Sequence, residues 1–382
     1  MNRPTAESGS PRVPIAPTAA RRERLAWIDL FRGAAVLIMI ETHVVNTFMI
    51  SVLRSEHWFT VLNYVNGLVA PSFLFIAGFV QGMERGASPD KPVNFARRAR
   101  QLLVLLLVAY GLHFPWTELG QHRWDDALRV GTQVDVLQCI AASLWLLLGV
   151  TWLAQKIGGR RGQSVWWTGL TALLLGVVFF SPHAAVWNGL PVPLQGWVNR
   201  STGSWFPLFS WAGFVLFGAL VGAAYGLARR AAESADLPAQ SVNSRAYSLG
   251  SLVKRSSSVF LITPLPLAFS AWAFRDATYS PVSPASFFER AAWVLVLAAL
   301  CEWLATRYRP SLPIFAGKYS LTLYVVHLLL ISTLVGAGLP MNTISLAGVL
   351  ALIAAIAATS LVLTWVIANA RVFVRAVRAP AK

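Results

Sequence analysis

The sequence predicts an all-α membrane protein, a polytopic bundle of about ten transmembrane helices with the N-terminus and the C-terminus in the cytoplasm. Three observations lead to this prediction. Of the 382 residues, 56% are hydrophobic and only 13% are charged. Apolar stretches long enough to cross a bilayer recur along the chain. The basic residues gather in alternate connections between those stretches, which is the charge pattern of a multispanning protein.

The apolar stretches define the predicted spans, and the segments around them define three regions. Residues 1–24 contain four prolines and lack the apolar core of a signal peptide, so we interpret them as a disordered cytoplasmic tail. Residues 25–370 form the transmembrane domain, with a serine-rich, mobile cytoplasmic loop at 229–257. Residues 371–382 form a cytoplasmic C-terminal tail. The ten spans are predicted at about 27–50, 61–83, 99–116, 134–154, 165–181, 205–227, 258–275, 288–305, 317–337 and 343–369. The fifth of these spans is the weakest prediction because its apolar stretch is short.

The net charge of +16 would suggest nucleic-acid binding in a soluble protein, so the distribution of the charges decides between two interpretations. With the N-terminus inside, 25 of the 32 Lys and Arg residues fall in cytoplasmic segments, six fall in the opposite loops, and Arg32 lies inside the first span. The positive-inside rule accounts for this basicity without nucleic acid. We therefore expect an integral protein of a bacterial inner (cytoplasmic) membrane.

The first span carries four ionisable residues, Asp29, Arg32, Glu41 and His43. Ionisable groups inside a bilayer cost roughly 2.5–3.5 kcal/mol each and are expected to face a protein interior or a wet cavity. Helical geometry puts Arg32 and His43 on one face, about 16 Å apart along the axis, with Asp29 and Asn46 on the same stripe and Glu41 on the opposite side. Asp29 and Arg32 are equally compatible with anchoring at the headgroups, whereas His43 lies too deep to reach either surface and indicates a functional site.

None of the six histidines lies in a predicted cytoplasmic segment. His43 falls in the outer half of the first span, His327 falls near the middle of the ninth, and the other four lie in outer loops or at outer span ends, at His57, His113, His122 and His183. Histidine is the side chain best suited to proton transfer near neutral pH. This distribution favours an outward-facing cavity in which protons are transferred.

Two further polar groups stand out in the spans. Ser320, Tyr324 and His327 form a polar seam on the ninth span, which either hydrogen-bonds to another helix or contacts a substrate. Asp135 and Gln138 share a face at the start of the fourth span, where the acid either orients a histidine or caps the helix. Both alternatives stay open for each group. Cys139 and Cys301 lie in predicted spans and are expected to be free thiols, and no metal motif is present.

These residues make the chain similar to transmembrane acyltransferases of the group that includes the heparan-alpha-glucosaminide N-acetyltransferase-like and the acyltransferase 3 families. Arg32 and His43 match the acyltransferase 3 pattern of arginine, ten residues and histidine, in which the histidine is implicated in catalysis. The segment Ile28–Gly33 resembles the start of the catalytic region in both branches. The segment Ala70–Gly78 resembles a helix of the heparan branch.

The two branches differ in the position of the histidine. His57 precedes Ala70 by thirteen residues, the spacing at which the heparan branch carries its catalytic histidine. That branch has asparagine where this chain has His43, and the acyltransferase 3 branch need not have His57. The resemblance therefore leaves open which of the two histidines performs the chemistry.

The resemblance implies an acyl-CoA co-substrate, acetyl-CoA or a longer homologue, bound from the cytoplasm, and a sugar or glycolipid acceptor on the other side, with a histidine as general base or transient acyl carrier and with no metal. Expected partners are therefore acyl-CoA, the acceptor and the lipid bilayer; a homo-oligomer is an open alternative to a monomer. The candidate residues are His43, His57, Arg32 and Asp135 for catalysis, Arg32, Arg97, Arg98 and Arg100 for the donor, and Asp29, Asn46, Gln138, Ser320, Tyr324 and His327 for the acceptor.

A carrier is the main alternative function. A proton-coupled transporter or flippase of a glycan or lipid would also place buried charges and outward histidines inside a bundle. A sensory or scaffold membrane protein is a third class, which the buried ionisable groups disfavour. Covalent alteration of the substrate separates an acyltransferase from both.

Overall fold

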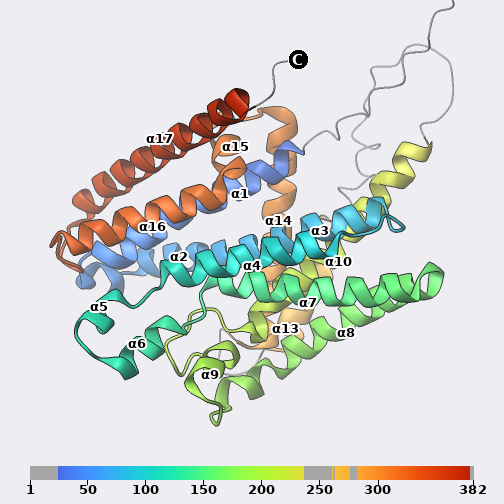
Figure 1. Ribbon diagram of the computed structural model, residues 1–382, viewed down its shortest axis with the longest axis horizontal. Helices are drawn as coiled ribbons and strands as arrows, with labels where there is room; N and C mark the ends of the chain where they lie inside the picture. Colours follow the sequence, from blue (N-terminus) through green and yellow to red (C-terminus); the bar gives the residue numbers. More distant parts are fainter. Residues whose placement is uncertain (1–24, 236–259, 261–262, 276–281, 379–382) are drawn as a thin grey trace, which may run out of the picture.

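The computed structural model describes residues 25–235, 260, 263–275 and 282–378, and it describes the side chains of these residues except at 232–235 and 371–378. This part of the chain is helical and contains a single isolated β-bridge, between Met49 and Ile344, so the all-α prediction is confirmed (Figure 1). The tail predicted at 1–24 and most of the loop predicted at 229–257 lie outside the described residues. The segment interpreted as a C-terminal tail is helical as far as Arg378.

Six helical segments are long and apolar enough to cross a membrane, by length and composition. A seventh candidate is a helix pair, α15 (Ser311–Lys318) and α16 (Ser320–Gly336), which is bent by 84° at the break. The chain is therefore a polytopic membrane protein. The six segments are the run α2 (His57–Asn66) with α3 (Val69–Ala87), α7 (Val136–Ile157), α8 (Gly159–Val186), α10 (Leu208–Ala235), α14 (Pro284–Arg307) and α17 (Leu346–Arg378).

Three predicted spans correspond to helices that do not meet this criterion. Helix α1 (Ala26–Phe48) carries three of the charged residues described above, α4 (Phe95–Leu112) begins with three arginines, and α13 (Pro264–Ala273) has only ten described residues. The number of ten spans and the orientation of the termini therefore remain predictions. The fifth predicted span is not the weakest, because α8 is a helix of 28 residues that begins six residues before the apolar stretch.

Short helices gather at one end of the bundle. They are η1 (Ser51–Ser55), α5 (Trp116–Gly120), α6 (Trp124–Gly131) and α9 (Val192–Val198). Figure 1 shows α5, α6 and α9 at the left, away from the end at which α10 terminates. All four lie in segments predicted as outer loops, and we call this end of the bundle the outer end.

Helices α3 and α10 form the tightest helix pair. Gly218 of α10 faces the carbonyl group of Phe75 of α3, and Gly222 faces that of Phe79. Residue numbers therefore increase in the same direction along both helices, so the two helices are parallel. A Cβ atom on any glycine of this seam would overlap backbone atoms of the other helix. Small residues at four-residue spacing allow such an approach between transmembrane helices. The seam consists of Gly78, Gly82 and Gly86 on α3 and Gly218, Gly222 and Gly226 on α10.

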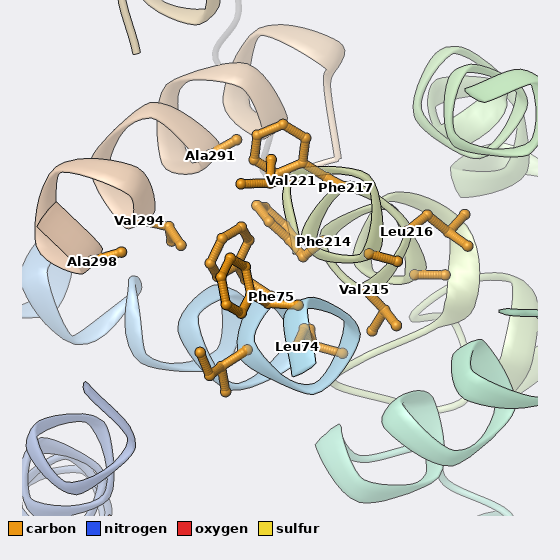
Figure 2. Close-up of a cluster of buried hydrophobic side chains, with 14 of the residues drawn as sticks. Leu74, Phe75, Phe214, Val215, Leu216, Phe217, Val221, Ala291, Val294 and Ala298 are labelled. Carbon is orange, nitrogen blue, oxygen red and sulfur yellow. The ribbon is translucent and has the colours of Figure 1, made fainter. Parts of the chain in front are cut away.

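The core lies around α10. In the apolar 18-residue stretch of α10, 78% of the residues are buried within the protein, compared with 17% in the corresponding stretch of α17. Helix α10 is therefore central and α17 is peripheral. Figure 2 shows Phe75 of α3 packed among Phe214 and Phe217 of α10 and Val294 of α14. The two cysteines are free and buried in α7 and α14, which confirms that prediction.

Candidate functional site

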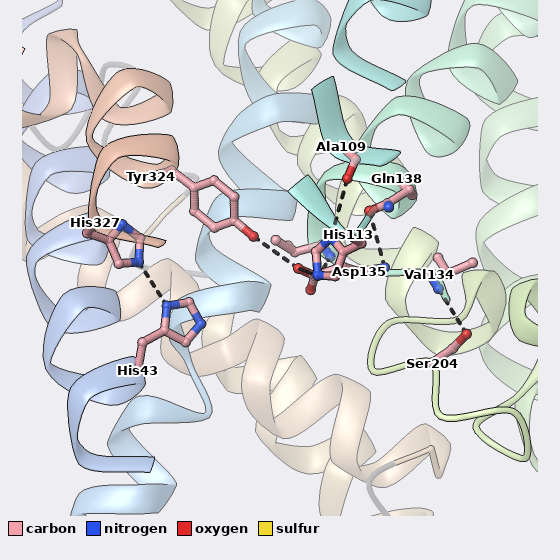
Figure 3. Close-up of polar contacts among 10 residues, drawn as sticks. His43, Ala109, His113, Val134, Asp135, Gln138, Ser204, Tyr324 and His327 are labelled. Atoms are coloured by element: carbon pink, nitrogen blue, oxygen red, sulfur yellow. Dashed lines mark hydrogen bonds and ion pairs between the residues drawn. The ribbon is translucent and has the colours of Figure 1, made fainter. Parts of the chain in front are cut away.

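The site begins with two histidines from distant parts of the chain. His43 of α1 and His327 of α16 lie with Nδ1 of the first 2.8 Å from Nε2 of the second, and the two rings are stacked with an interplanar angle of 14° (Figure 3). His327 is fully buried and His43 is partly buried.

The break between α15 and α16 produces this contact. Helix α15 packs on the first half of α1, where Gly33 and Gly317 let the two backbones touch: a Cβ on Gly33 would overlap Pro313, and one on Gly317 would overlap Asp29. The 84° bend then redirects the chain into α16, which also packs on α1. His327 therefore reaches His43 because the preceding helix is anchored by two glycines.

The hydrogen bonds of His327 determine the tautomers of the neutral pair. Nδ1 of His327 lies 2.8 Å from the carbonyl oxygen of Leu323, which can only accept, so Nδ1 carries the proton and Nε2 is an acceptor. Nδ1 of His43 must then donate to Nε2 of His327. No carboxylate among the described residues forms an ion pair with either ring, and an unpaired buried charge is costly, which favours the neutral pair. Nε2 of His43 is left with a free lone pair.

A second polar group is centred on Asp135, which precedes α7. Oδ1 of Asp135 accepts from the backbone N–H of Val136 at 2.7 Å, and Oε1 of Gln138 accepts from the N–H of Asp135 at 3.2 Å, which makes a capping box. Oδ2 accepts from the hydroxyl of Tyr324 at 3.1 Å and lies 3.3 Å from Nε2 of His113. Asp135 thus caps the helix, which is one of the two predicted alternatives, and it also contacts a histidine.

His113 was not among the site residues predicted from the sequence. Its Nδ1 lies 3.3 Å from the carbonyl oxygen of Ala109, and its Nε2 faces Asp135. Both neighbours are hydrogen-bond acceptors, so His113 lies between the Ala109 carbonyl group and the Asp135 carboxylate. Its position as the residue that ends α4, two positions before Pro115, is the local signal that could have drawn attention to it.

The two groups are joined through Tyr324. The Tyr324 ring meets the His327 ring edge-on, with centroids 5.6 Å apart and an interplanar angle of 78°. Figure 3 shows Tyr324 between the His43–His327 pair and Asp135, with His113 beside Asp135. We call these five residues the histidine–aspartate network: His43, His327, Tyr324, Asp135 and His113.

A basic cleft of about 700 Å³ lies at the end of the bundle opposite the short helices. Its polar wall comes from the end of α3, the beginning of α4 and the segment between them, and includes Lys91, Arg97 and Arg98. Arg98 is held by Glu84 at 2.7 Å. The apolar wall includes Leu144 of α7 and reaches Leu321, which lies three residues before Tyr324.

The remaining predicted site residues are distributed as follows. Arg97 and Arg98 line the cleft, whereas Arg100 is exposed and is not part of its lining. Asp29 is buried and Arg32 is partly buried at the α15 end of α1. Ser320 is buried one turn before Tyr324. Asn46 is exposed, and His57 is exposed at the start of α2, so neither joins the histidine–aspartate network. Glu41 lies beside Asn66, a different neighbour as its position on α1 predicts.

The fold and the network define a polytopic membrane protein with a buried, histidine-centred polar site. Residues 24–265, more than half of the chain, match the family described as heparan-alpha-glucosaminide N-acetyltransferase, catalytic. The chain therefore belongs to this family of membrane acetyltransferases. The match includes His43, His113 and Asp135 and ends before α14, so Tyr324 and His327 come from outside it. No curated protein matches the chain.

Proposed function

We propose that the protein transfers an acyl group, acetyl in the first instance, from cytoplasmic acyl-CoA to a hydroxyl or amine of a sugar or glycolipid acceptor at the outer side. The observation that carries this proposal is the neutral His43–His327 pair, in which Nε2 of His43 keeps a free lone pair. A base or nucleophile with these properties is what acyl transfer requires.

The donor enters through the basic cleft. Arg97, Arg98 and Lys91 offer cationic groups for the phosphates of coenzyme A, and arginine suits phosphate because its guanidinium binds in a bidentate way. The leucine wall accommodates the less polar arm that carries the thioester. Since this wall ends at Leu321, three residues before Tyr324, the thioester approaches the histidine–aspartate network from the cleft side. Arg32, on the same face of α1 as His43, assists the passage of the donor.

The chemical step uses the free nitrogen of His43. As general base, Nε2 takes the proton of the acceptor hydroxyl or amine while the acceptor oxygen or nitrogen attacks the thioester carbonyl carbon. Collapse of the tetrahedral intermediate breaks the carbon–sulfur bond, and the coenzyme A sulfur leaves with the proton returned by His43. As acyl carrier, the same nitrogen would attack the thioester first and pass the acyl group on. In both cases His327 fixes the orientation of the ring through Nδ1.

The experiment uses the purified chain in lipid vesicles with labelled acetyl-CoA and a panel of cell-envelope glycans and glycolipids. The variants are His43→Gln, His57→Gln and, as a matched control, His183→Gln, which changes an exposed histidine of α8. We expect His43→Gln to lower the transfer rate by roughly 100-fold or more and His183→Gln to leave it unchanged. An unchanged rate in His43→Gln would falsify the assignment of the chemical step to His43, and an unchanged rate in His57→Gln as well would remove both candidate histidines.

Two further readouts separate the mechanisms. Acid-quenched protein that carries label on His43 before acceptor is added would identify an acyl-enzyme, whereas a general base leaves the protein unlabelled. Movement of an acceptor across the vesicle membrane without any acylated product would instead identify a carrier.

A further inference from the structure

Two arginines converge on one buried tryptophan at the outer end of the bundle. The guanidinium of Arg200 lies 6.0 Å from the centroid of the Trp211 ring, and that of Arg290 lies 5.9 Å from it. Arg200 belongs to the loop between α9 and α10, and Arg290 lies near the start of α14. Like charges repel, so two cations at one ring are unfavourable unless something else balances them.

No carboxylate in the described part of the chain forms an ion pair with either arginine. The adjacent acid, Glu289, accepts a hydrogen bond from Tyr64 at 2.6 Å. Arg200 donates to the carbonyl oxygen of Trp205 at 3.1 Å, which fixes its position but does not neutralise it. Burial, and then the positive charge of Arg290, lower the pKa of Arg200.

Trp211 supplies an independent sign of a missing acceptor. Its side chain is only 5% exposed, and its indole Nε1 is buried without a hydrogen-bond acceptor among the described residues. An indole N–H can only donate, and a buried donor without a partner carries a desolvation cost. The backbone breaks directly before this residue, since Ser210 has a φ of 73° inside α10. Three donor side chains thus meet where the described residues provide no anion.

The same loop is hydrogen-bonded to the segment that precedes Asp135. The N–H of Phe206 donates to the carbonyl oxygen of Val134 at 3.1 Å. The hydroxyl of Ser204 accepts from the N–H of Val134 at 2.9 Å (Figure 3). Phe206 also packs edge-on against Trp211, with ring centroids 4.7 Å apart. Val134 directly precedes Asp135, so the loop that carries Arg200 is hydrogen-bonded next to one member of the network.

We propose that Arg200, Arg290 and Trp211 bind an oxyanion, a phosphate or carboxylate group, which belongs to the acceptor or to an anionic lipid headgroup. Guanidinium groups bind such oxyanions through paired, charge-assisted hydrogen bonds. Where the oxyanion belongs to the acceptor, the inference rests on the proposed function. Binding itself is measured without acyl-CoA, so the site can be tested even if no acyl transfer is found.

The test measures binding to the full chain in neutral phosphatidylcholine nanodiscs. The soluble probes are inorganic phosphate and glucuronate, and the lipid probe is phosphatidylglycerol added to the nanodisc. The variants are Arg200→Gln and Arg290→Gln. The matched control is Arg123→Gln, which removes an equal charge at the same end from an arginine that already faces Glu118 and Asp126. Arg200→Lys and Arg290→Lys retain the positive charge, and they test the site even if the glutamine variants do not fold.

We expect each glutamine variant to weaken binding of at least one probe by roughly tenfold or more, and Arg123→Gln to leave it unchanged. The lysine variants should bind with intermediate affinity, because lysine keeps the charge but loses the bidentate geometry. Binding of glucuronate or phosphate assigns the oxyanion to a soluble acceptor group, and binding of phosphatidylglycerol alone assigns it to a lipid. Absence of binding by every probe, or equal losses in Arg123→Gln, would overturn the inference.

Discussion

Nδ1 of His43 lies 2.8 Å from Nε2 of His327, although 284 residues separate the two in the chain. The hydrogen bond from His327 to Leu323 means that His327 can only accept from His43 in the neutral pair. His43 is therefore the ring with the available nitrogen, and His327 acts through it as a positioning residue. This difference in role gives the first prediction.

Replacing His327 with leucine should lower kcat by roughly tenfold to 100-fold, by analogy with the loss of a partner that orients a metal-binding imidazole. Leucine cannot accept the proton on Nδ1 of His43, so the tautomer of His43 is no longer fixed. His327→Gln should recover part of the rate because an amide oxygen accepts in the same position. The measurement is steady-state transfer from labelled acetyl-CoA. Equal losses in the leucine and glutamine variants would indicate a packing role instead.

Asp135 should contribute to stability through the capping box as well as through its charge. Asn caps helices about as well as Asp, whereas alanine at such a position costs roughly 0.5–2 kcal/mol. We therefore expect Asp135→Ala to unfold at a lower temperature than Asp135→Asn in detergent thermal melts. Asp125→Ala, at an exposed site on α6, serves as the control and should melt close to the unchanged protein. If the two Asp135 variants melt together, the cap does not contribute.

The sequence predicted individual residues of the histidine–aspartate network, but it did not predict which of them contact one another. His43 was predicted because ionisable residues in an apolar stretch are costly and indicate a functional site. Tyr324 and His327 were predicted because they form a polar seam on an apolar helix. Their pairing could not be derived, since it depends on an 84° bend between Lys318 and Ser320 that no proline or spacing signal in that segment announces. Local sequence describes one helix at a time, and the register between helices is decided by packing.

His113 and the arginine pair were missed for the same reason. His113 falls at the outer end of the third predicted span, and only the fold brings it to Asp135, whose possible role as a cap was visible from spacing. Arg200 and Arg290 lie far apart in the sequence, with α10 and α13 between them among the described residues, and the sequence analysis counted them only as outer-loop charges. The lengths of α8 and of the α2–α3 run were underestimated because polar turns at helix ends carry no hydropathy signal.

The contact between α1 and α15 should control both stability and activity. A methyl group added at Gly317 would overlap the backbone at Asp29, so Gly317→Ala must displace α15 and, through the bend, α16 with His327. We expect a loss of about 1–3 kcal/mol in stability, as for other overpacked sites, together with a lower transfer rate. Gly176→Ala in α8 is the control because its Cβ meets open space. Similar melting temperatures and rates for the two variants would show that α15 adjusts without moving His327.

The basic cleft should determine the affinity for the donor without affecting the chemical step. Arg97 forms no side-chain hydrogen bond or ion pair with the described residues, whereas Arg98 is held by Glu84, so Arg97→Gln removes a cation with the least disturbance. Loss of a charge-assisted contact to a phosphate is worth about 1.5–3 kcal/mol, which predicts a KM for acetyl-CoA raised by roughly tenfold or more at unchanged kcat. Arg100→Gln is the matched control, because this arginine of the same helix does not line the cleft and should leave KM unchanged.

Adenosine 3′,5′-diphosphate, which carries phosphate groups without the thioester arm, should inhibit the unchanged protein competitively and the Arg97→Gln variant more weakly. A KM that rises equally in the Arg97 and Arg100 variants would mean that the arginines act through overall charge, and the donor would then have to bind elsewhere.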